Sequence, residues 1–204
     1  VADSARRRDG LARLGLGTDT AVAEWDDLLA DPALADDYER IVALDPPPLP
    51  EALVAPDALA PLACGRRAYA LWGERELRFA LSVWRWRLDL RPHLRELWQA
   101  LAAAGGTLAG DELARALHGR YRHGRPPSLV HALLATLGEL GLVAIEGAAP
   151  IPHRLVLLAT ARDRVELERS PTFVRCRRQL DALERAAARA TGAGGRELAA
   201  SSRL

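Results

Sequence analysis

The sequence predicts a mainly helical α+β protein, in which a partial α/β layer is followed by a winged-helix-like domain and a C-terminal helix. Two short apolar runs come first, leucine stripes at helical spacing follow, and three of the predicted helices precede a hairpin pattern. We therefore expect residues 1–73 to form an acidic partial layer with an incomplete sheet. Residues 74–190 should form the basic winged-helix-like domain with its C-terminal helix, and the Gly-rich residues 191–204 a flexible tail.

The partial layer contains two candidate strands. Residues 41–44 are an apolar run that Asp45 and three prolines end, and residues 68–72 are a second run of the same kind. Short, fully apolar strands with a helical connection between them are typical of neighbours in a parallel sheet. Because two strands make a poor sheet alone, we expect their partners to be missing or to lie within residues 1–23.

From Glu74 onward, leucine and tryptophan recur at helical spacing. The breakers and caps that divide this pattern into four helices are Arg91-Pro92, Gly105-Gly106, Asp111, Ser128 and Gly141. Asp111 is expected to cap the third helix and Ser128 the fourth, because short polar side chains satisfy the free N–H groups at a helix start. Gly141 suits the end of the fourth helix.

A hairpin is predicted after these helices. Residues 142–145 and 155–158 are apolar runs with a turn region at residues 146–147 after the first of them. Three helices followed by a hairpin are the order of a winged helix, and the join at residues 139–143 is its sharpest local signal. The last helix should begin at Ser170-Pro171, where a capping hydroxyl precedes proline at the first helical position.

The net charge of +1 hides a separation of charge along the chain. Residues 1–62 carry 13 acidic and 5 basic side chains, whereas residues 63–204 carry 14 acidic and 23 basic ones. The basic part favours a polyanionic partner such as nucleic acid. All 28 basic residues are arginine, which together with the many Ala and Gly residues indicates a GC-rich genome rather than selection for phosphate binding.

The residue types argue against several kinds of site. The chain has no lysine, so neither a Walker lysine nor a Schiff-base lysine exists, and Gly15-Leu16-Gly17 lacks the third glycine of a dinucleotide loop. The histidines show no metal-binding pair at helical spacing, and the acidic run from Asp26 to Asp37 is interpreted as a solvated surface. We therefore predict no catalytic residue, no metal site and no cofactor in this chain.

The location is predicted from three absences in the sequence. No apolar run approaches the roughly 18 residues of a membrane helix. Arg6-Arg7-Arg8 is not followed by an apolar signal core, and the two cysteines, Cys64 and Cys176, cannot form a disulfide framework. These features predict a cytoplasmic protein.

Arginines gather near three features of the basic part: the turn before the fourth helix, the hairpin and the last helix. Guanidinium groups suit phosphate, and an aromatic ring among them can stack on an unpaired base. The candidate nucleic-acid-binding residues are Arg115, Arg120, Tyr121, Arg122, His123, Arg125, Arg154, Arg175 and Arg178. Arg162 and Arg164 also flank the hairpin. The alternative interpretation is that these side chains are solvated faces with local ion pairs, such as Asp181 with Arg185.

The fourth helix indicates how nucleic acid would be read. Its first turns are expected to present Leu129, His131, Ala132 and Ala135 outward, which offers almost no bidentate side chain for base edges. Contact with the phosphate backbone, or with a protein, fits this surface better than sequence-specific reading.

The order of five segments resembles the carboxy-terminal region of RecJ, the bacterial single-stranded-DNA-specific exonuclease. They are residues 41–47 (IVALDPP), 71–79 (LWGERELRF), 89–94 (DLRPHL), 137–143 (LGELGLV) and 167–173 (LERSPTF). The resemblance spans roughly residues 37–183. Each segment alone is a weak signal, and their order and spacing together are the more specific feature.

The resemblance implies a parent enzyme that degrades single-stranded DNA from 5′ to 3′ in recombination and repair. In that family Mg²⁺ or Mn²⁺ is held by Asp and His residues of upstream catalytic domains. This chain has no Asp-His-His motif, so no catalytic residue of the family can be carried onto it. The chain begins with Val1 and contains no Met, so we expect a piece of a longer polypeptide, with an alternative start codon as the other interpretation.

The role expected from the resemblance is to extend the DNA path or to dock a partner. The expected partners are single-stranded DNA, single-stranded-DNA-binding protein and the upstream catalytic domains of the same polypeptide. Two other functions stay open. One is a free-standing winged-helix regulator that binds duplex DNA as a symmetric dimer, and the other is a structural module that braces catalytic domains or mediates a protein interaction.

Overall fold

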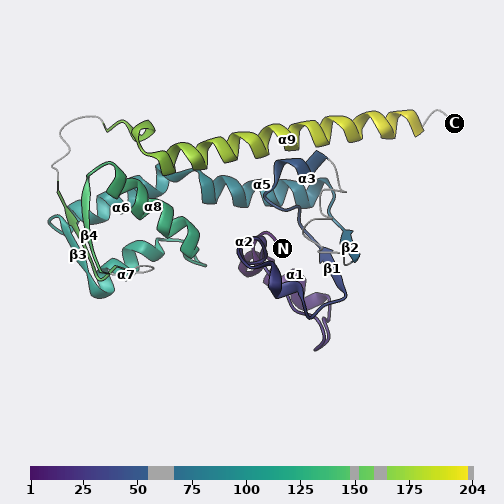
Figure 1. The fold of residues 1–204 in the computed structure, drawn as a ribbon, viewed down its shortest axis with the longest axis horizontal. Helices are drawn as coiled ribbons and strands as arrows, with labels where there is room; N and C mark the ends of the chain where they lie inside the picture. The colour runs from purple at the N-terminus through teal and green to yellow at the C-terminus, as the bar shows by residue number, and fades with distance from the viewer. Residues whose placement is uncertain (55–66, 148–151, 159–164, 202–204) are drawn as a thin grey trace. The chain divides into compact units, whose positions relative to one another are not determined.

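The computed structural model describes residues 1–54, 67–147, 152–158 and 165–201 and forms two compact units (Figure 1). The first unit comprises Val1–Arg85 together with Asp181–Leu204, and the second comprises Trp86–Leu180. The fold is α+β and mainly helical, as predicted. The predicted boundary after residue 73 differs from the division into units, which places most of the next helix in the first unit.

The first unit contains a two-stranded parallel sheet. Its elements are α1 (Ser4–Arg13), α2 (Trp25–Ala30), a 3-10 helix (Pro32–Ala35), β1 (Arg40–Ala43), α3 (Pro50–Val54), β2 (Arg67–Ala70) and most of α5 (Glu74–Leu88). Ile41 pairs with Ala68 and Val42 with Tyr69, which confirms the predicted parallel neighbours. Within the described residues this sheet has two strands, and α1 occupies the region where a further strand was one expectation.

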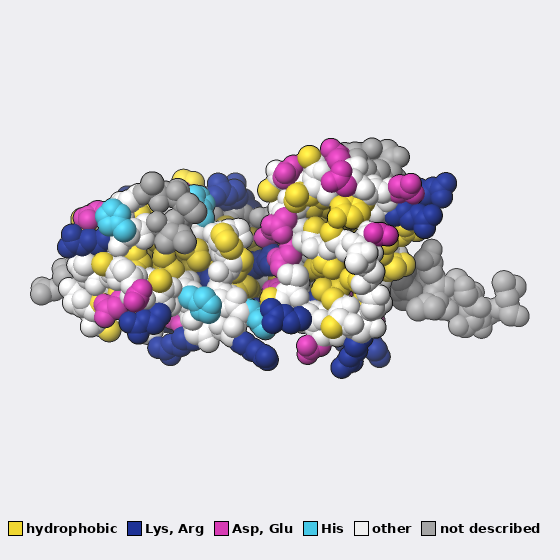
Figure 2. Space-filling view, turned by 90° about the horizontal axis from the view of Figure 1, so that it is seen from below, with side chains coloured by type: hydrophobic (Ala, Val, Ile, Leu, Met, Phe, Trp, Pro, Cys, Tyr) yellow, Lys and Arg dark blue, Asp and Glu magenta, His cyan; other side chains and the backbone are white. Residues whose placement is uncertain are grey.

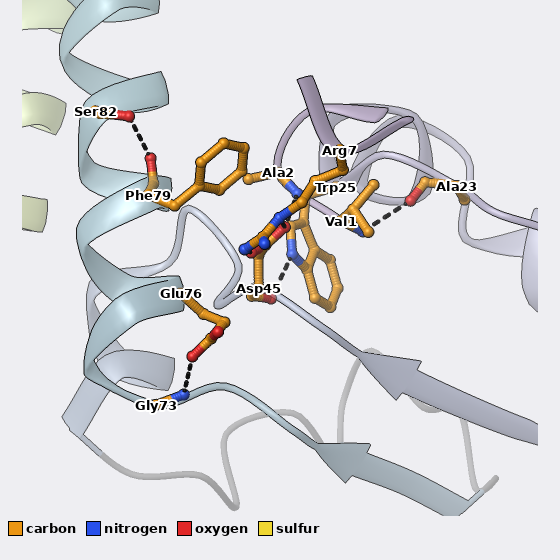
Figure 3. A network of polar contacts seen from close by, with 10 residues as sticks. All are labelled: Val1, Ala2, Arg7, Ala23, Trp25, Asp45, Gly73, Glu76, Phe79 and Ser82. Carbon is orange, nitrogen blue, oxygen red and sulfur yellow. Dashed lines mark hydrogen bonds and ion pairs between the residues drawn. The ribbon is translucent and has the colours of Figure 1, made fainter. Parts of the chain in front are cut away.

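Asp45 holds the start of the chain to the end of β1 (Figure 3). This buried carboxylate pairs with Arg7 of α1 and accepts a hydrogen bond from the backbone N–H of Ala2 at 3.0 Å. The backbone carbonyl of Asp45 accepts a hydrogen bond from the indole N–H of Trp25 at 2.9 Å. The Arg7 guanidinium also lies 4.1 Å from the ring centroid of Phe79 on α5. A buried charge that is paired and hydrogen-bonded in this way joins α1 and α5 around the strand end.

Helix α5 shows why the boundary moves. Its buried residues Leu77, Ala80, Val83 and Trp84 lie before Arg85 and do not belong to the winged-helix core. Arg85 donates to Glu184, in the part of α9 that belongs to the same unit, at 2.6 Å. The helical pattern in the sequence shows that residues 74–88 form a helix, but it does not show which core the helix joins.

The second unit has the order and strand topology of a winged helix. Its elements are α6 (Leu90–Ala103), β3 (Thr107–Ala109), α7 (Gly110–His118), α8 (Pro127–Glu139), β4 (Val143–Glu146), β5 (Arg154–Leu157), a 3-10 helix (Leu167–Arg169) and the first part of α9 (Pro171–Ser201). The predicted hairpin is confirmed, since β4 and β5 pair in antiparallel fashion. Strand β3 was not predicted. It pairs with β5 and completes the sheet order β3-β5-β4.

Leucine side chains fill the core of the second unit. Leu97, Leu101, Leu133 and Leu155 are fully buried and bring α6, α8 and β5 together. Burial of a leucine side chain contributes about 1.5–3 kcal/mol to folding. The leucine stripes of the sequence therefore identified the residues that hold the winged-helix unit together.

Several helix starts differ from their predicted caps. Helix α6 begins after Asp89, whose carboxylate accepts from the N–H of Arg91 at 3.3 Å, so Pro92 lies within the first turn, where proline is tolerated. Asp111 lies inside α7, which starts at Gly110. Helix α8 starts at Pro127, so Ser128 is a first-turn residue and not the cap. The proline takes the first helical position because its fixed φ suits that position.

The predicted start of α9 is confirmed. The hydroxyl of Ser170 accepts a hydrogen bond from the N–H of Phe173 at 3.1 Å, and Pro171 is the first helical residue. Glu139 at the end of α8 binds this helix start, accepting from the hydroxyl of Ser170 and from the N–H of Thr172 at 3.0 Å. Helix α9 continues to Ser201, past the predicted start of the tail, and the flexibility of residues 191–204 stays a prediction.

Candidate nucleic-acid interface

The turn between α7 and α8 is built around the guanidinium of Arg125. Arg125 is 6% exposed, and its head group pairs with Glu96 of α6. It also donates to the carbonyl of Ala116 at 2.8 Å and to Nδ1 of His93 at 3.2 Å. A phosphate would have to displace these partners. The prediction that Arg125 contacts nucleic acid therefore does not fit its placement, and Arg125 instead positions the turn.

His93 completes this network as a neutral side chain. Its Nε2 lies 2.7 Å from the carbonyl of Trp86, which can only accept, so Nε2 carries the proton and Nδ1 is free to accept from Arg125. Burial lowers the pKa of His93, and the positive charge of Arg125 lowers it further, against the opposing effects of the Trp86 carbonyl and Glu96. The neutral form is the one that the hydrogen bonds require.

Sequence reasoning missed His93 and Glu96 as parts of this site. His93 lies between Leu90 and Leu94 on the buried stripe of α6, and Glu96 is followed by the buried Leu97. A histidine on an apolar face is a signal for a buried polar partner, but the sequence does not show which residue that partner is.

Two glycines allow the turn to close on these side chains. Gly119 has a φ of 77°, and a Cβ placed there would lie 2.8 Å from Cζ of Arg125. Gly124 has a φ of 69°, and its Cβ would lie 2.5 Å from Nε2 of His118. Both the backbone conformation and the close approach favour glycine at these positions. Because Arg125 is enclosed, the guanidinium near Gly119 cannot easily move away.

The other polar side chains of the turn between α7 and α8 lie at the surface. Arg120, whose side chain is 89% exposed, Arg122 and His123 all lie in this turn, and Arg115 is exposed in the last turn of α7. Figure 2 shows arginine and histidine side chains at the surface of the molecule on the face seen from below. Arg120 also approaches Glu96 at 3.5 Å, an ion pair that solvent screens strongly.

Tyr121 is the aromatic member of the turn and is 37% exposed. Its ring centroid lies 5.2 Å from that of Trp86 and 5.5 Å from that of His93, with interplanar angles of 81° and 61°. Edge-to-face contacts of this kind stabilise aromatic clusters. The ring is therefore held by its neighbours while part of it stays accessible to solvent.

The remaining candidates lie on other elements. Arg154 of β5 pairs with Glu146 of β4 at 3.5 Å, and Arg175 donates to the hydroxyl of Thr172 at 3.3 Å. Arg178 is exposed on α9. Of the candidates, Arg120, Tyr121, Arg122 and His123 are consecutive and lie in one turn, a few residues after Arg115 at the end of α7. Arg162, Arg164 and Cys64 lie outside the described residues.

The surface of α8 agrees only in part with the prediction. Leu129, expected to point outward, is 2% exposed and belongs to the core, because it lies at helical spacing from the buried Leu133 and Leu137 on the same face of α8. The exposed residues of its first turns are Pro127, Ser128 and His131. This surface still offers few groups that could form paired hydrogen bonds to base edges.

Other kinds of site find little support in the described part of the chain. No group of three or more His, Cys, Asp or Glu side chains is placed there to hold a metal ion. Cys176 is buried in the winged-helix core, and burial raises the pKa of its thiol, which disfavours the reactive thiolate. None of the described helices combines the length and apolar character needed to cross a membrane.

Comparisons with known protein families, with curated proteins and with solved structures found no match to this chain. The resemblance to the carboxy-terminal region of RecJ stays a prediction that rests on the five sequence segments. The Asp and His ligands that the family uses for Mg²⁺ or Mn²⁺ have no counterpart in this sequence, which lacks Asp-His-His.

Proposed function

We propose that this chain is a C-terminal accessory segment of a RecJ-like, single-stranded-DNA-specific exonuclease, and that it acts in the cytoplasm in DNA recombination and repair. Its winged-helix unit binds the phosphate backbone of single-stranded DNA, while bond cleavage takes place in upstream catalytic domains. The DNA-binding role is supported mainly by the turn between α7 and α8. This turn exposes Arg120 and Arg122, and the contacts of the buried Arg125 hold its backbone in place.

The geometry of the turn supports phosphate binding. Arg120 and Arg122 carry exposed guanidinium groups on a segment whose conformation is maintained by the ion pair of the buried Arg125 with Glu96. A fixed backbone lowers the entropy that is lost when the side chains bind a ligand. Exposed guanidinium groups on such a backbone match a chain of phosphates better than they match an apolar partner.

The surface of α8 disfavours the alternative of a sequence-specific regulator. Pro127, Ser128 and His131 provide one hydroxyl and one imidazole, without the Arg, Asn or Gln side chains that usually read base edges. Contact with phosphates fits this helix, because such contacts position a protein on DNA without reading the sequence.

The proposal is tested by binding of the 204-residue chain to fluorescent oligo-dT at a series of salt concentrations. The variant Arg120→Ala/Arg122→Ala should bind more weakly. Each lost phosphate contact on a single strand should reduce the magnitude of the slope of log K against log salt by about 0.7. The slope of the double variant should therefore be smaller in magnitude by about 1.4. The control Arg8→Ala removes an exposed arginine from α1 and should leave both affinity and slope unchanged.

Two further results bear on the proposal. Equal binding by the wild type and the Arg120/Arg122 variant would refute the assigned surface. If the chain does not bind oligo-dT but binds single-stranded-DNA-binding protein, the DNA-binding role is refuted and the role of docking this partner is supported instead. An in-frame upstream coding sequence with Asp-His-His would support the RecJ-like parent, and an unrelated upstream sequence would contradict it.

A further inference from the structure

We infer that Tyr121 is a stacking platform for one unpaired nucleobase, so that the turn between α7 and α8 distinguishes single strands from duplex. This inference rests on the proposed DNA-binding function and adds to it a specific ligand, the face of a base that is not already stacked in a double helix. The guanidinium groups of Arg120 and Arg122 alone would bind the phosphates of single-stranded and of duplex DNA.

The ring of Tyr121 is held in place by its neighbours. Trp86 lies against it at 5.2 Å between centroids and His93 at 5.5 Å, both in edge-to-face orientation. Cζ of Arg125 lies 6.0 Å from the ring centroid, within the range of a cation–π contact. His93 and Arg125 are themselves fixed by their hydrogen bond, so the ring has rigid neighbours. A base that stacks on an ordered ring loses less entropy than one that must order a mobile side chain.

The ring of Tyr121 is also accessible to solvent between two exposed arginines. Tyr121 is 37% exposed, although it takes part in an aromatic cluster with Trp86 and His93. Arg120 and Arg122 flank it in sequence, and both are exposed. Aromatic rings between phosphate-binding side chains are the usual arrangement by which proteins bind single strands without reading their sequence. In a duplex the faces of the bases are occupied by their neighbours.

The test compares two ligands with equal numbers of phosphates, oligo-dT and an abasic oligonucleotide of the same length, in anisotropy titrations with the full chain. The wild type should bind oligo-dT more tightly than the abasic strand. Tyr121→Leu should lose at least about fivefold in affinity for oligo-dT and leave the affinity for the abasic strand unchanged. Tyr121→Phe, which keeps the ring, should behave like the wild type.

A spectroscopic signature and a matched control complete the experiment. A 2-aminopurine base within the oligonucleotide should lose fluorescence on binding to the wild type and to Tyr121→Phe, but not on binding to Tyr121→Leu. Tyr69→Leu, which removes a 43% exposed tyrosine from β2, should change neither affinity nor quenching.

The failures of the two proposals are distinguishable. If the wild type binds neither oligonucleotide, the proposed DNA-binding function fails and this inference fails with it. If the wild type binds both strands equally well, DNA binding stands and the stacking role of Tyr121 is refuted. An equal loss for both strands in Tyr121→Leu also refutes stacking, because the ring would then act only by maintaining the turn.

Discussion

The charge of Arg125 lies inside the winged-helix unit, and its neighbours make this position tolerable. Glu96 supplies the opposite charge, and the carbonyls of Ala116 and Leu117 together with Nδ1 of His93 accept the N–H groups. Removing one partner from a buried pair costs about 3–5 kcal/mol, since it leaves an uncompensated charge. Arg125 therefore links α6 to the turn before α8, and its contribution to binding comes through the neighbours it holds.

The protonation of His93 should make the stability of this unit depend on pH. Its folded pKa lies below the ordinary value of about 6.5, so the unfolded chain takes up this proton at a higher pH than the folded chain does. The free energy of unfolding therefore has its full contribution from neutral His93 above about pH 7. This contribution falls as the pH drops through about 6.5 towards the lowered pKa. Urea unfolding of the chain between about pH 8 and pH 5 measures this dependence.

The variant His93→Gln isolates this effect. Its amide N–H can donate to the carbonyl of Trp86 and its oxygen can accept from Arg125, so the variant keeps both hydrogen bonds without a titrating group in this range. The exposed histidines remain in both proteins. We expect a smaller loss of stability towards acid in His93→Gln, and identical profiles for the two proteins would contradict the role of His93.

At the scale of elements, the conformation of the α7–α8 turn depends on glycine where the chain approaches Arg125. Gly119 and Gly141 both have positive φ values, 77° and 65°, but only Gly119 has a buried guanidinium next to the missing side chain. Gly119 also combines its positive φ with a ψ of −177°, a backbone region that only glycine adopts readily, so both the backbone and the contact disfavour a side chain there.

We expect Gly119→Ala to be the more destabilising substitution. Gly141→Ala should cost about 1 kcal/mol for the positive φ alone, because nothing lies within 4 Å of the added Cβ. Gly119→Ala should cost at least roughly 1–3 kcal/mol more, because Cζ of Arg125 would be 2.8 Å away and because alanine strains the Gly119 backbone. Thermal unfolding of both variants measures the difference. Equal costs would contradict both the strain expected for alanine in the Gly119 backbone and the close contact with Arg125.

At the scale of the whole molecule, the proposal separates binding from catalysis. The basic part of the sequence supplies the arginines of the winged-helix unit, while the catalytic Asp-His-His motif of the resembled family is not in the sequence. Guanidinium contacts with phosphate need no metal ion. The chain should therefore bind DNA by electrostatics and leave the DNA intact.

Metal removal tests this separation. At matched ionic strength, EDTA should leave the affinity of the chain for oligo-dT unchanged, and the chain incubated with Mg²⁺ or Mn²⁺ should release no nucleotides. A metal-dependent exonuclease on the same oligonucleotide provides the positive control. Hydrolysis by the purified chain that EDTA abolishes would show that catalysis belongs to this segment and would overturn the proposal.

The elements that the sequence predicted well are those with local signals. The apolar runs of β1 and β2, the leucine stripes of α6 and α8, the β4–β5 hairpin and the Ser170-Pro171 start of α9 follow from residues that are close in sequence. Strand β3 escaped prediction because it has three residues and exists through its pairing with β5, some fifty residues later.

The fold class, the parallel pairing of β1 with β2 and the group of arginines before α8 were predictable from residue order, since helical spacing, apolar runs and charge are local properties. The burial of Arg125, in contrast to the exposure of its neighbours Arg120 and Arg122, depends on contacts between helices. The partners of Arg125 come from α6 and α7, and its desolvation is tolerable only where Glu96 and His93 lie in contact with it. Such contacts depend on how the helices pack, which residue order alone does not specify.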